Sequence, residues 1–418
     1  MAAAGRDDNT EALDAFVAEL AARALALRGA LRASGVAGRL AQRLAPLERL
    51  TRPGQEPRHD ADVAAGECAQ LLALSLAHAR ALALRERELS FDGPGALRRV
   101  PTTSPLLAAI FESLLGVLEG EGAVAYLDGL CGWLGSARCE SVLREHGELL
   151  PDRYDRFLSR YDAEAQRARG VYFTPPELVG FMWRSVERAL EQELGVALDD
   201  PDLSFLDPAV GGGAFLVWLC DRQDAAGLRA AADGRLHGFE VMLPAYAVTH
   251  LRLAQRLLRR APGAALPRVD LCLASALVKP PRAAVEAGGS DALAAAIRAE
   301  ARAARALHEG AVDVVIGNPP YRRSSDNVHP EIAQRMGPYK RPLAAEPNLQ
   351  PLSDDYVKFV RRLEVMLEQR ERAVLALVTP STYLSGRLYR AMRGSLLSTF
   401  PRADLVDLHG SARGEKPA

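Results

Sequence analysis

The stretch LSFLDPAVGGG, residues 203–213, joins a short apolar run to three successive glycines. The run predicts a buried strand, and the glycines predict a tight loop that a ligand can approach closely. The helix expected next would present its first N–H groups without intrahelical acceptors. Asp207 stands at the expected carboxyl end of the strand, where ligands bind in open α/β sheets. A tight turn without any ligand is the alternative interpretation of this loop.

From about residue 170 onward, similar short runs alternate with long amphipathic stretches. They are LHGFE (236–240), VDLCLAS (269–275), DVVIGNPPY (313–321), AVLALVTP (373–380) and ADLVDLHG (403–410). Alternation of strands and helices predicts a parallel sheet covered by helices, so we expect an α/β fold. Residues 281–309, rich in Ala and Arg, predict a helical connection between two of the strands.

The first 160 residues have a different texture. Apolar residues recur every three or four positions over about 13–31, 64–84 and 106–118, which predicts an α-helical N-terminal module over 1–160. No apolar run of 18 residues appears, so we expect no membrane span, and the acidic N-terminus favours a cytoplasmic protein. The five cysteines form no CxxC pair and the eight histidines lack metal-ligand spacing; we therefore expect reduced thiols and no metal.

The second strand of the α/β region ends in an acidic residue, Glu240. A carboxylate one strand after a glycine loop can accept the two ribose hydroxyls of a nucleoside. A solvated strand end is the alternative. The order of glycine loop, acidic strand end and NPPY favours a nucleoside-containing cofactor other than a dinucleotide.

The motif Asn318-Pro319-Pro320-Tyr321 follows the buried run 313–316. Two consecutive prolines fix two φ angles, and the second pushes the first toward an extended conformation. The result is a rigid extension that carries a side-chain amide and a phenol, which a plain turn does not need.

This order of motifs resembles the S-adenosylmethionine-dependent adenine-specific DNA methyltransferases, in which NPPY binds a flipped-out adenine. The resemblance implies a Rossmann-like methyltransferase domain over 161–418. The Asn318 oxygen and the Pro319 carbonyl would accept the two hydrogens of the adenine amine, while the prolines keep that carbonyl preorganised. Tyr321 would stack on the base, a contact worth about 1–3 kcal/mol.

The segment GVYFTPPELVGFM, residues 170–182, lies upstream of the glycine loop, as in the γ-type class of these enzymes. In that family such a segment closes over the methionine part of the cofactor. Glutamine-modifying protein methyltransferases share NPPY but, as a family, lack it. The resemblance implies the following cofactor-binding residues: Tyr172, Thr174, Pro175, Asp207, Ala209, Gly211, Gly213, Phe215, Glu240 and Asn318.

Four longer stretches, 152–175, 238–254, 352–364 and 382–416, look like the methyltransferase region of type ISP restriction–modification enzymes. This implies adenine methylation of duplex DNA at a defined sequence, in restriction–modification or phage defence. Ala274-Ser275 stand where the family usually has an acidic or amide residue that contacts the cofactor's adenine ring. Nuclease and helicase motifs are not found, and we expect the target-recognition domain to be absent.

DNA is the expected partner, with a separate specificity or restriction subunit as a further candidate. Arg322, Arg323, Lys340 and Arg341 could meet phosphates, or could form a solvated loop. Two other functions remain open: methylation of a planar amine or amide on protein or RNA, and a cofactor-binding subunit that is inactive alone. The intact NPPY motif disfavours the second.

Overall fold

The structure is a computed structural model that describes residues 4–55, 60–85, 91, 93–162, 174–222, 234–261, 265–286, 289–322, 325 and 327–408. Its centre is a parallel sheet with the strand order β3-β2-β1-β4-β5. All four strand pairs are parallel, which confirms the expected α/β fold. The strands are β1 (Phe205–Asp207), β2 (Leu236–Glu240), β3 (Asp270–Leu273), β4 (Val314–Gly317) and β5 (Val374–Leu377).

The N-terminal part is helical throughout its described residues, as expected. Its elements are α1 (Ala4–Ala33), α2 (Val36–Thr51), α3 (Ala61–Arg85), η1 (Gly93–Arg99), α4 (Pro105–Gly120), η2 (Ala123–Leu127), α5 (Asp128–Leu134), α6 (Ala137–His146), η3 (Gly147–Arg153) and α7 (Tyr154–Tyr161). Helix α3 runs through the middle of this layer and is buried along most of its length. Its Leu- and Ala-rich sequence suits that position, because a helix that is apolar all round has to be buried.

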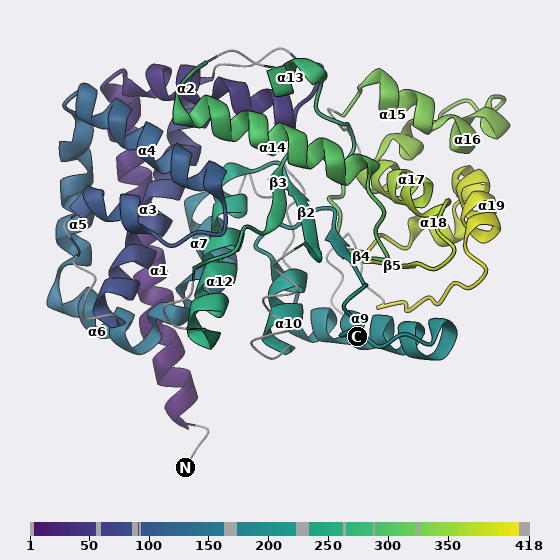
Figure 1. Cartoon of the computed structure of the whole chain (residues 1–418), viewed down its shortest axis with the longest axis horizontal. Coiled ribbons are helices and arrows are strands. Elements are labelled where there is room, and N and C mark those ends of the chain that lie inside the picture. The colour runs from purple at the N-terminus through teal and green to yellow at the C-terminus, as the bar shows by residue number, and fades with distance from the viewer. Residues whose placement is uncertain are drawn as a thin grey trace.

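The helical layer and the sheet share one continuous hydrophobic core. Backbone hydrogen bonds join the two parts: Val269 donates to the Thr103 carbonyl (3.1 Å) and Ser275 donates to the Leu50 carbonyl (3.0 Å). Both bonds lie at the ends of β3, the edge strand nearest the helices in Figure 1. The helical layer therefore covers that edge of the sheet, which would otherwise present unpaired backbone groups.

Helices also cover both faces of the sheet. Helices α9 (Pro176–Ala189), α10 (Ala214–Arg222) and α12 (Leu243–Arg260) lie on one side, and α14 (Ala292–Glu309) and α17 (Asp355–Leu367) lie on the other (Figure 1). On the first side, Trp183 stacks on Trp218 with ring centroids 5.5 Å apart and meets Phe205 of β1 edge-on. This burial of aromatic area fixes α9 and α10 against the strand that precedes the glycine loop.

The connection expected over 281–309 is helical but consists of two helices, α13 (Arg282–Glu286) and α14. Gly289 has a φ of 122°, which only glycine adopts readily, and Asp291 caps α14 by accepting a hydrogen bond from Ala294 N–H (2.8 Å).

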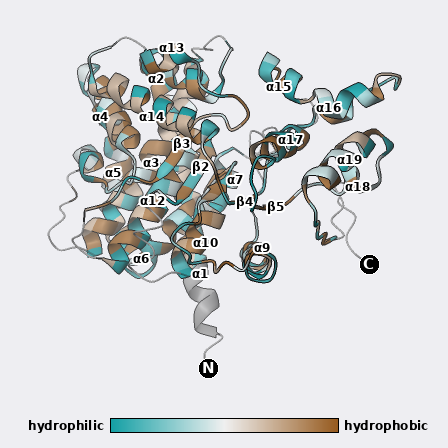
Figure 2. Ribbon diagram, turned by 45° about the vertical axis from the view of Figure 1, so that its right-hand side comes forward, coloured by the Kyte–Doolittle hydropathy of each residue, from teal (hydrophilic) through white to brown (hydrophobic). Residues whose placement is uncertain are grey.

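The remaining elements form a lobe on the far side of β4 and β5 from the helical layer, as Figure 2 shows. The lobe consists of α15 (Pro330–Arg335), α16 (Gly337–Lys340), η5 (Arg341–Leu343), η6 (Gln350–Ser353), α17, α18 (Thr382–Ser385), η7 (Arg387–Tyr389) and α19 (Arg390–Thr399). Outside the lobe, η4 (Leu190–Leu194) continues α9.

The strand expected at 403–410 is wrong for its described part, because residues 403–408 belong to no strand. Leu405 and Leu408 are 64% and 61% exposed, and the sheet ends at β5. Alternating apolar residues form a strand only where a neighbouring strand pairs with their backbone and a packed layer buries their apolar side chains. In the described part of the chain, residues 403–408 have neither.

A buried carboxylate, Glu364, holds the lobe together. Tyr339 and Arg361 donate to its Oε2 (2.6 and 2.7 Å), and Ser395 and Thr399 donate to its Oε1 (2.6 and 3.1 Å). The side chain is fully buried, so its charge is stabilised by these donors from α16, α17 and α19.

We expect Glu364→Ala to lower the free energy of unfolding by about 3–5 kcal/mol, because it leaves a buried guanidinium and several hydroxyls without an acceptor. Chemical denaturation would measure the change. Glu368→Ala is the matched control, since Glu368 follows the same helix and is exposed. Equal, small effects of the two substitutions would contradict the role given to Glu364.

None of the helices in the described part of the chain is long and apolar enough to cross a membrane. The five cysteines are free thiols. Within the described ranges, no group of three or more His, Cys, Asp or Glu side chains is arranged to hold a metal ion.

Candidate functional site

The sheet reverses its direction of growth between β1 and β4, which are neighbours in space but far apart in sequence. At such a switch point the loops after the two strands diverge and leave room for a ligand at the carboxyl ends. Here the two loops are the glycine loop 208–213 and the NPPY motif. The two sequence motifs therefore lie side by side at this edge of the sheet.

Gly317, the last residue of β4, shows how closely the two loops approach each other. A Cβ atom at this position would lie 2.8 Å from Asp207 Oδ1 and 3.0 Å from Pro208 Cδ. Real Cβ atoms do not come this close, so only glycine fits between the motif and the end of β1. Asn318 follows directly after this close approach.

The glycine loop is shaped by its own residues and by α12. Gly211 and Gly213 have φ values of 54° and 80°, and a Cβ on Gly213 would lie 2.7 Å from Thr249 Cγ2. Asp207 Oδ1 accepts a hydrogen bond from Ala209 N–H (3.0 Å), and Thr249 donates to the Gly211 carbonyl (2.8 Å). Helix α10 begins at Ala214, so its first N–H groups have no intrahelical acceptors.

Glu240 at the end of β2 ties this loop to the start of α12. Its Oε2 accepts from Gly211 N–H (2.8 Å), and its Oε1 accepts from the N–H groups of Val241 and Met242 (2.8 and 2.7 Å). The solvated strand end considered above is therefore not what the structure shows. Glu240 is a half-buried carboxylate with a fixed orientation at the strand end.

Asp207 is fully buried, and burial raises the pKa of its carboxyl to about 7. The Ala209 N–H opposes this rise, and the nearby charge of Glu240 adds to it. Asp207 Oδ2 has no hydrogen-bond partner in the described part of the chain. A buried carboxylate oxygen left in this state costs about 1–3 kcal/mol, which suits a group that meets a ligand.

The NPPY motif is held by segments that are distant in sequence. Asn318 Nδ2 donates to Thr174 Oγ1 (3.1 Å), so the structure brings the upstream segment and the motif together. The Tyr321 hydroxyl lies within hydrogen-bond distance of both Asn318 Oδ1 and the Val378 carbonyl, the latter at 3.1 Å, and its single proton can go to either. The ring of Tyr321 packs edge-on against Tyr356 of α17 at 6.4 Å.

The other expected cofactor residues lie in different surroundings. Pro175 is exposed immediately before α9, and Ala209 is half-buried in the glycine loop. Phe215 on α10 is 3% exposed, and its carbonyl accepts a hydrogen bond from Trp183 (3.0 Å). Tyr172 lies outside the described residues.

Two of the expected DNA-contact residues, Arg322 and Lys340, contact adjacent residues of the segment 353–354. The backbone of Arg322 is held by Asp354, whose Oδ1 accepts from Arg322 N–H (2.9 Å). Lys340 ends α16 and donates to Ser353 Oγ (3.3 Å), while Arg341 is exposed at the start of η5. Arg323 lies outside the described residues.

Sequence reasoning missed the residues that order the chain after the motif. Lys358 of α17 is 6% exposed and donates to Ser325 Oγ (2.6 Å) and to the Asn327 carbonyl (2.8 Å). Asp355, 3.7 Å from Lys358, accepts a hydrogen bond from Asn327 Nδ2 (2.9 Å). The sequence did contain one indication of these contacts, a lysine on the apolar face of an amphipathic helix. Lysine is almost never buried without a partner, so such a position predicts one.

Ser275, at the position where the family usually has an acidic or amide residue, has a structural task. Its Oγ accepts from the N–H groups of Leu277 and Val278 (3.2 and 3.3 Å) and so closes the turn after β3. The side-chain oxygen is thus oriented by backbone groups of its own turn.

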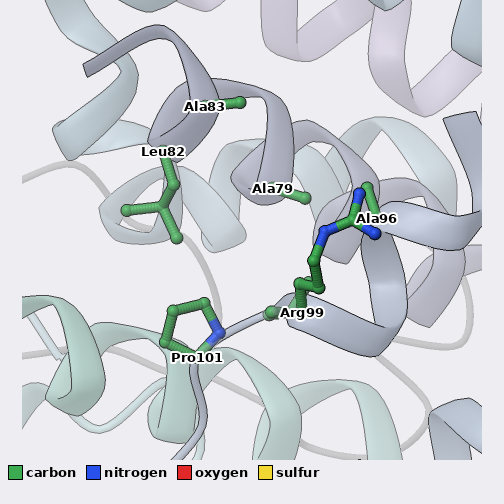
Figure 3. A pocket seen from close by; sticks show the side chains of 7 residues that line it. Ala79, Leu82, Ala83, Ala96, Arg99 and Pro101 are labelled. Atoms are coloured by element: carbon green, nitrogen blue, oxygen red, sulfur yellow. The ribbon is translucent and has the colours of Figure 1, made fainter. Parts of the chain in front are cut away.

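A small pocket elsewhere in the molecule has no part in this site. Figure 3 shows it between α3 and the segment 96–101, within the helical layer. Apart from Arg99 its lining is apolar, formed by Ala79, Leu82, Ala83, Ala96, Val100 and Pro101. It holds none of the chemical groups found at the carboxyl end of the sheet.

One family model and several solved structures match the chain. Residues 285–413 match the model of the Eco57I restriction-modification methylase family. The Eco57I-type match begins in α13 and includes β4, the NPPY motif and α17. None of the curated proteins matches the chain significantly.

Three solved structures show the same fold as this protein. The DrdV–DNA complex matches 94% of the chain at a TM-score of 0.66 and 20% identity. The type ISP restriction-modification enzyme LlaBIII bound to DNA matches 92% at 0.66 and 19% identity. A nuclease-deletion mutant of the type ISP enzyme LlaGI, with a DNA substrate mimic, matches 93% at 0.58 and 18% identity. The chain spans only 37%, 26% and 31% of their respective lengths.

Proposed function

We propose that this protein transfers the methyl group of S-adenosylmethionine to the exocyclic amine of a flipped-out adenine in DNA, as part of a restriction–modification system. The observation that carries the proposal is the contact between the end of β4 and the end of β1. Gly317 approaches Asp207 and Pro208 at this contact, and Asn318 and Pro319 follow Gly317 directly, which supports a position of the NPPY motif next to the glycine loop. A methyl acceptor and a methyl donor need to be adjacent in this way.

The glycine loop and its neighbours fit the proposed cofactor. Asp207 Oδ2 is buried and has no hydrogen-bond partner in the described part of the chain, which suits a cationic ligand. A positive charge nearby would stabilise the ionised carboxylate against the unfavourable effect of burial. Gly211 and Gly213 allow close approach of a ligand to the backbone, and Glu240 stands at the next strand end to accept hydroxyl hydrogens. When bound, S-adenosylmethionine supplies an electrophilic methyl group with a neutral thioether as the leaving group.

The chain's own groups would act on the adenine amine. Its lone pair is delocalised into the purine ring, so the amine is a poor nucleophile until its hydrogens are held by acceptors. Asn318 Oδ1 and the Pro319 carbonyl are such acceptors, and the Thr174 bond to Asn318 Nδ2 fixes which way the amide faces. Burial of Pro319 and the rigid prolines keep this geometry in place without reorganisation.

The test is transfer of a labelled methyl group to unmethylated duplex DNA, followed by digestion to nucleosides and identification by mass. We expect N6-methyladenine and no methylcytosine. Label on a protein or RNA substrate, but not on DNA, would favour the alternative use of the NPPY loop. Transfer that appears only after a second protein is added would identify a partner-dependent subunit. No binding of S-adenosylmethionine at all would refute the enzymatic proposal.

Tyr321 allows stacking and hydrogen bonding to be separated. We expect Tyr321→Ala to lower kcat/KM for DNA by about 10- to 100-fold, since a stacked base is worth about 1–3 kcal/mol. Tyr321→Phe keeps the ring and removes only the hydroxyl, which lies within hydrogen-bond distance of Asn318 Oδ1 and the Val378 carbonyl. Its kcat/KM should therefore stay within about threefold of the parent. Steady-state kinetics on a short duplex would measure both; equal losses in the two variants would contradict a stacking role.

A further inference from the structure

An arginine on α12 connects the glycine loop to the helical N-terminal part of the chain. Arg252 donates through one terminal nitrogen of its guanidinium to the Gly212 carbonyl. Through Nε it donates to Asp152 Oδ1, 2.7 Å away, in η3. The side chains of Arg252 and Asp152 are 14% and 24% exposed, so the pair is only weakly screened by solvent.

Asp152 is held on its other side by the next turn of α12. Arg256 donates to Asp152 Oδ2 (3.1 Å) and also reaches Asp221 of α10 (3.3 Å). Each planar guanidinium group can donate hydrogen bonds to acceptors on different segments at the same time. A lysine ammonium on its flexible stem fixes the geometry of such bonds less well. Asp152 is therefore the point where the helical layer, α12 and, through Arg252, the glycine loop meet.

The loop needs such support because its glycines have little conformational preference of their own. Glu240 holds the Gly211 N–H and Thr249 holds the Gly211 carbonyl, and both belong to the α/β part of the chain. The Gly212 carbonyl, in contrast, accepts a hydrogen bond from Arg252, and the side chain of Arg252 is oriented by Asp152 of the helical part. The carboxylate lies 100 residues before Arg252 in the sequence.

We propose that Asp152 and Arg252 are positioning residues for the cofactor loop, so that the helical N-terminal part belongs to the methyl-donor site. The inference rests on the proposed function for the identity of the ligand. The coupling of Asp152 to the loop is a separate claim that can be measured without any ligand. Loss of the Asp152 charge frees Arg252 to turn away from the Gly212 carbonyl, and the loop then samples more conformations.

The chain offers a matched control in the same short helix. Glu148 of η3 also pairs with an arginine of α12, Arg259 at 3.7 Å, and with Arg85 of α3 at 2.9 Å. Neither of these arginines contacts the glycine loop in the described structure. Glu148→Gln therefore removes a charge that, like Asp152, joins η3 to α12, while the contacts of Asp152 and Arg252 stay intact.

The experiment compares the parent, Asp152→Asn, Arg252→Lys and Glu148→Gln as full-length proteins. Hydrogen–deuterium exchange of peptides covering residues 207–216 measures the order of the loop without ligand. Isothermal titration with S-adenosylmethionine measures affinity, and steady-state methyl transfer to DNA separates KM for each substrate from kcat. Thermal unfolding of every variant reports any general loss of stability.

We expect faster loop exchange and an affinity for S-adenosylmethionine about 5- to 10-fold weaker in Asp152→Asn and Arg252→Lys, the scale of one ordinary net hydrogen bond, because the effect reaches the ligand only through the loop. KM for DNA and kcat at saturating cofactor should change little, and Glu148→Gln should match the parent in loop exchange and affinity. Parent-like loop exchange and affinity in Asp152→Asn would overturn the inference alone. A parent protein that binds no S-adenosylmethionine would overturn the proposed function, while loop exchange in Asp152→Asn would still decide whether Asp152 orders the loop.

Discussion

Asn318→Ala should reduce methyl transfer to DNA by about 10²–10³-fold or more, the scale observed when a preorganised hydrogen-bonding group of an active site is removed. The substitution deletes the amide oxygen that would accept a hydrogen of the adenine amine, and it also deletes the donor to Thr174. The methyl-donor side of the site is left with its own contacts. The loss should therefore fall mainly on kcat.

Two further variants make this result specific to the amide. Asn318→Asp keeps an acceptor oxygen at the same place and loses only the donor to Thr174, so it should retain at least about tenfold more activity than Asn318→Ala. Asn348→Ala removes an exposed amide from the surface, and it should behave like the parent. Single-turnover transfer measures the chemical step directly. Full activity in Asn318→Ala would remove the NPPY motif from the mechanism.

Asp207→Asn should have opposite effects on stability and on cofactor binding. The parent carboxyl is buried, its pKa is raised to about 7 by burial, and Oδ2 has no partner in the described structure. An asparagine keeps the oxygen that accepts from Ala209 N–H and carries no charge. We expect the free energy of unfolding to rise by roughly 1–3 kcal/mol at pH 8 and the affinity for S-adenosylmethionine to fall by at least about tenfold.

The stability difference should depend on pH in a defined direction. Because the pKa of Asp207 is higher in the folded protein than in the unfolded chain, the folded state holds a proton that the unfolded state releases between about pH 4 and 7. The contribution of Asp207 to stability is thus present at low pH and is lost as the pH rises through about 7. Asp207→Asn should therefore gain most over the parent above pH 7 and nothing near pH 4.

Cofactor binding by the parent should follow the ionisation of the same group. A cationic ligand favours the carboxylate, so affinity for S-adenosylmethionine should increase as the pH rises from about 6 to 8, and Asp207→Asn should abolish this dependence. Titrations in matched buffers at several pH values would measure it, with Asp202→Asn as an exposed control near the same strand. A parent that is less stable than Asp207→Asn but binds the cofactor equally well would make Asp207 a structural carboxylate only.

The loops and strands of this chain could be predicted from the sequence because they depend on the backbone preferences and hydrophobicity of neighbouring residues. Glycines at 211–213 predict a tight loop, prolines at 319 and 320 predict a rigid extension, and short apolar runs predict the strands of a parallel sheet. The structure confirms the sheet and the helical N-terminal part. The same kind of pattern predicted a strand at 403–410, which the described residues do not form, because a strand requires a partner that residue alternation cannot supply.

The contacts that assemble the site are a property of the tertiary structure alone. Thr174 meets Asn318 across 144 positions of sequence and Asp152 meets Arg252 across 100, and no spacing rule covers such distances. The raised pKa of Asp207 likewise comes from burial by surrounding elements rather than from its neighbours in sequence. The sequence by itself thus determined which chemical groups stand at the strand ends. Only the packing of the helical layer, α12 and the sheet decided which of those groups are buried, charged and held together, because burial and long-range pairing exist only in the folded chain.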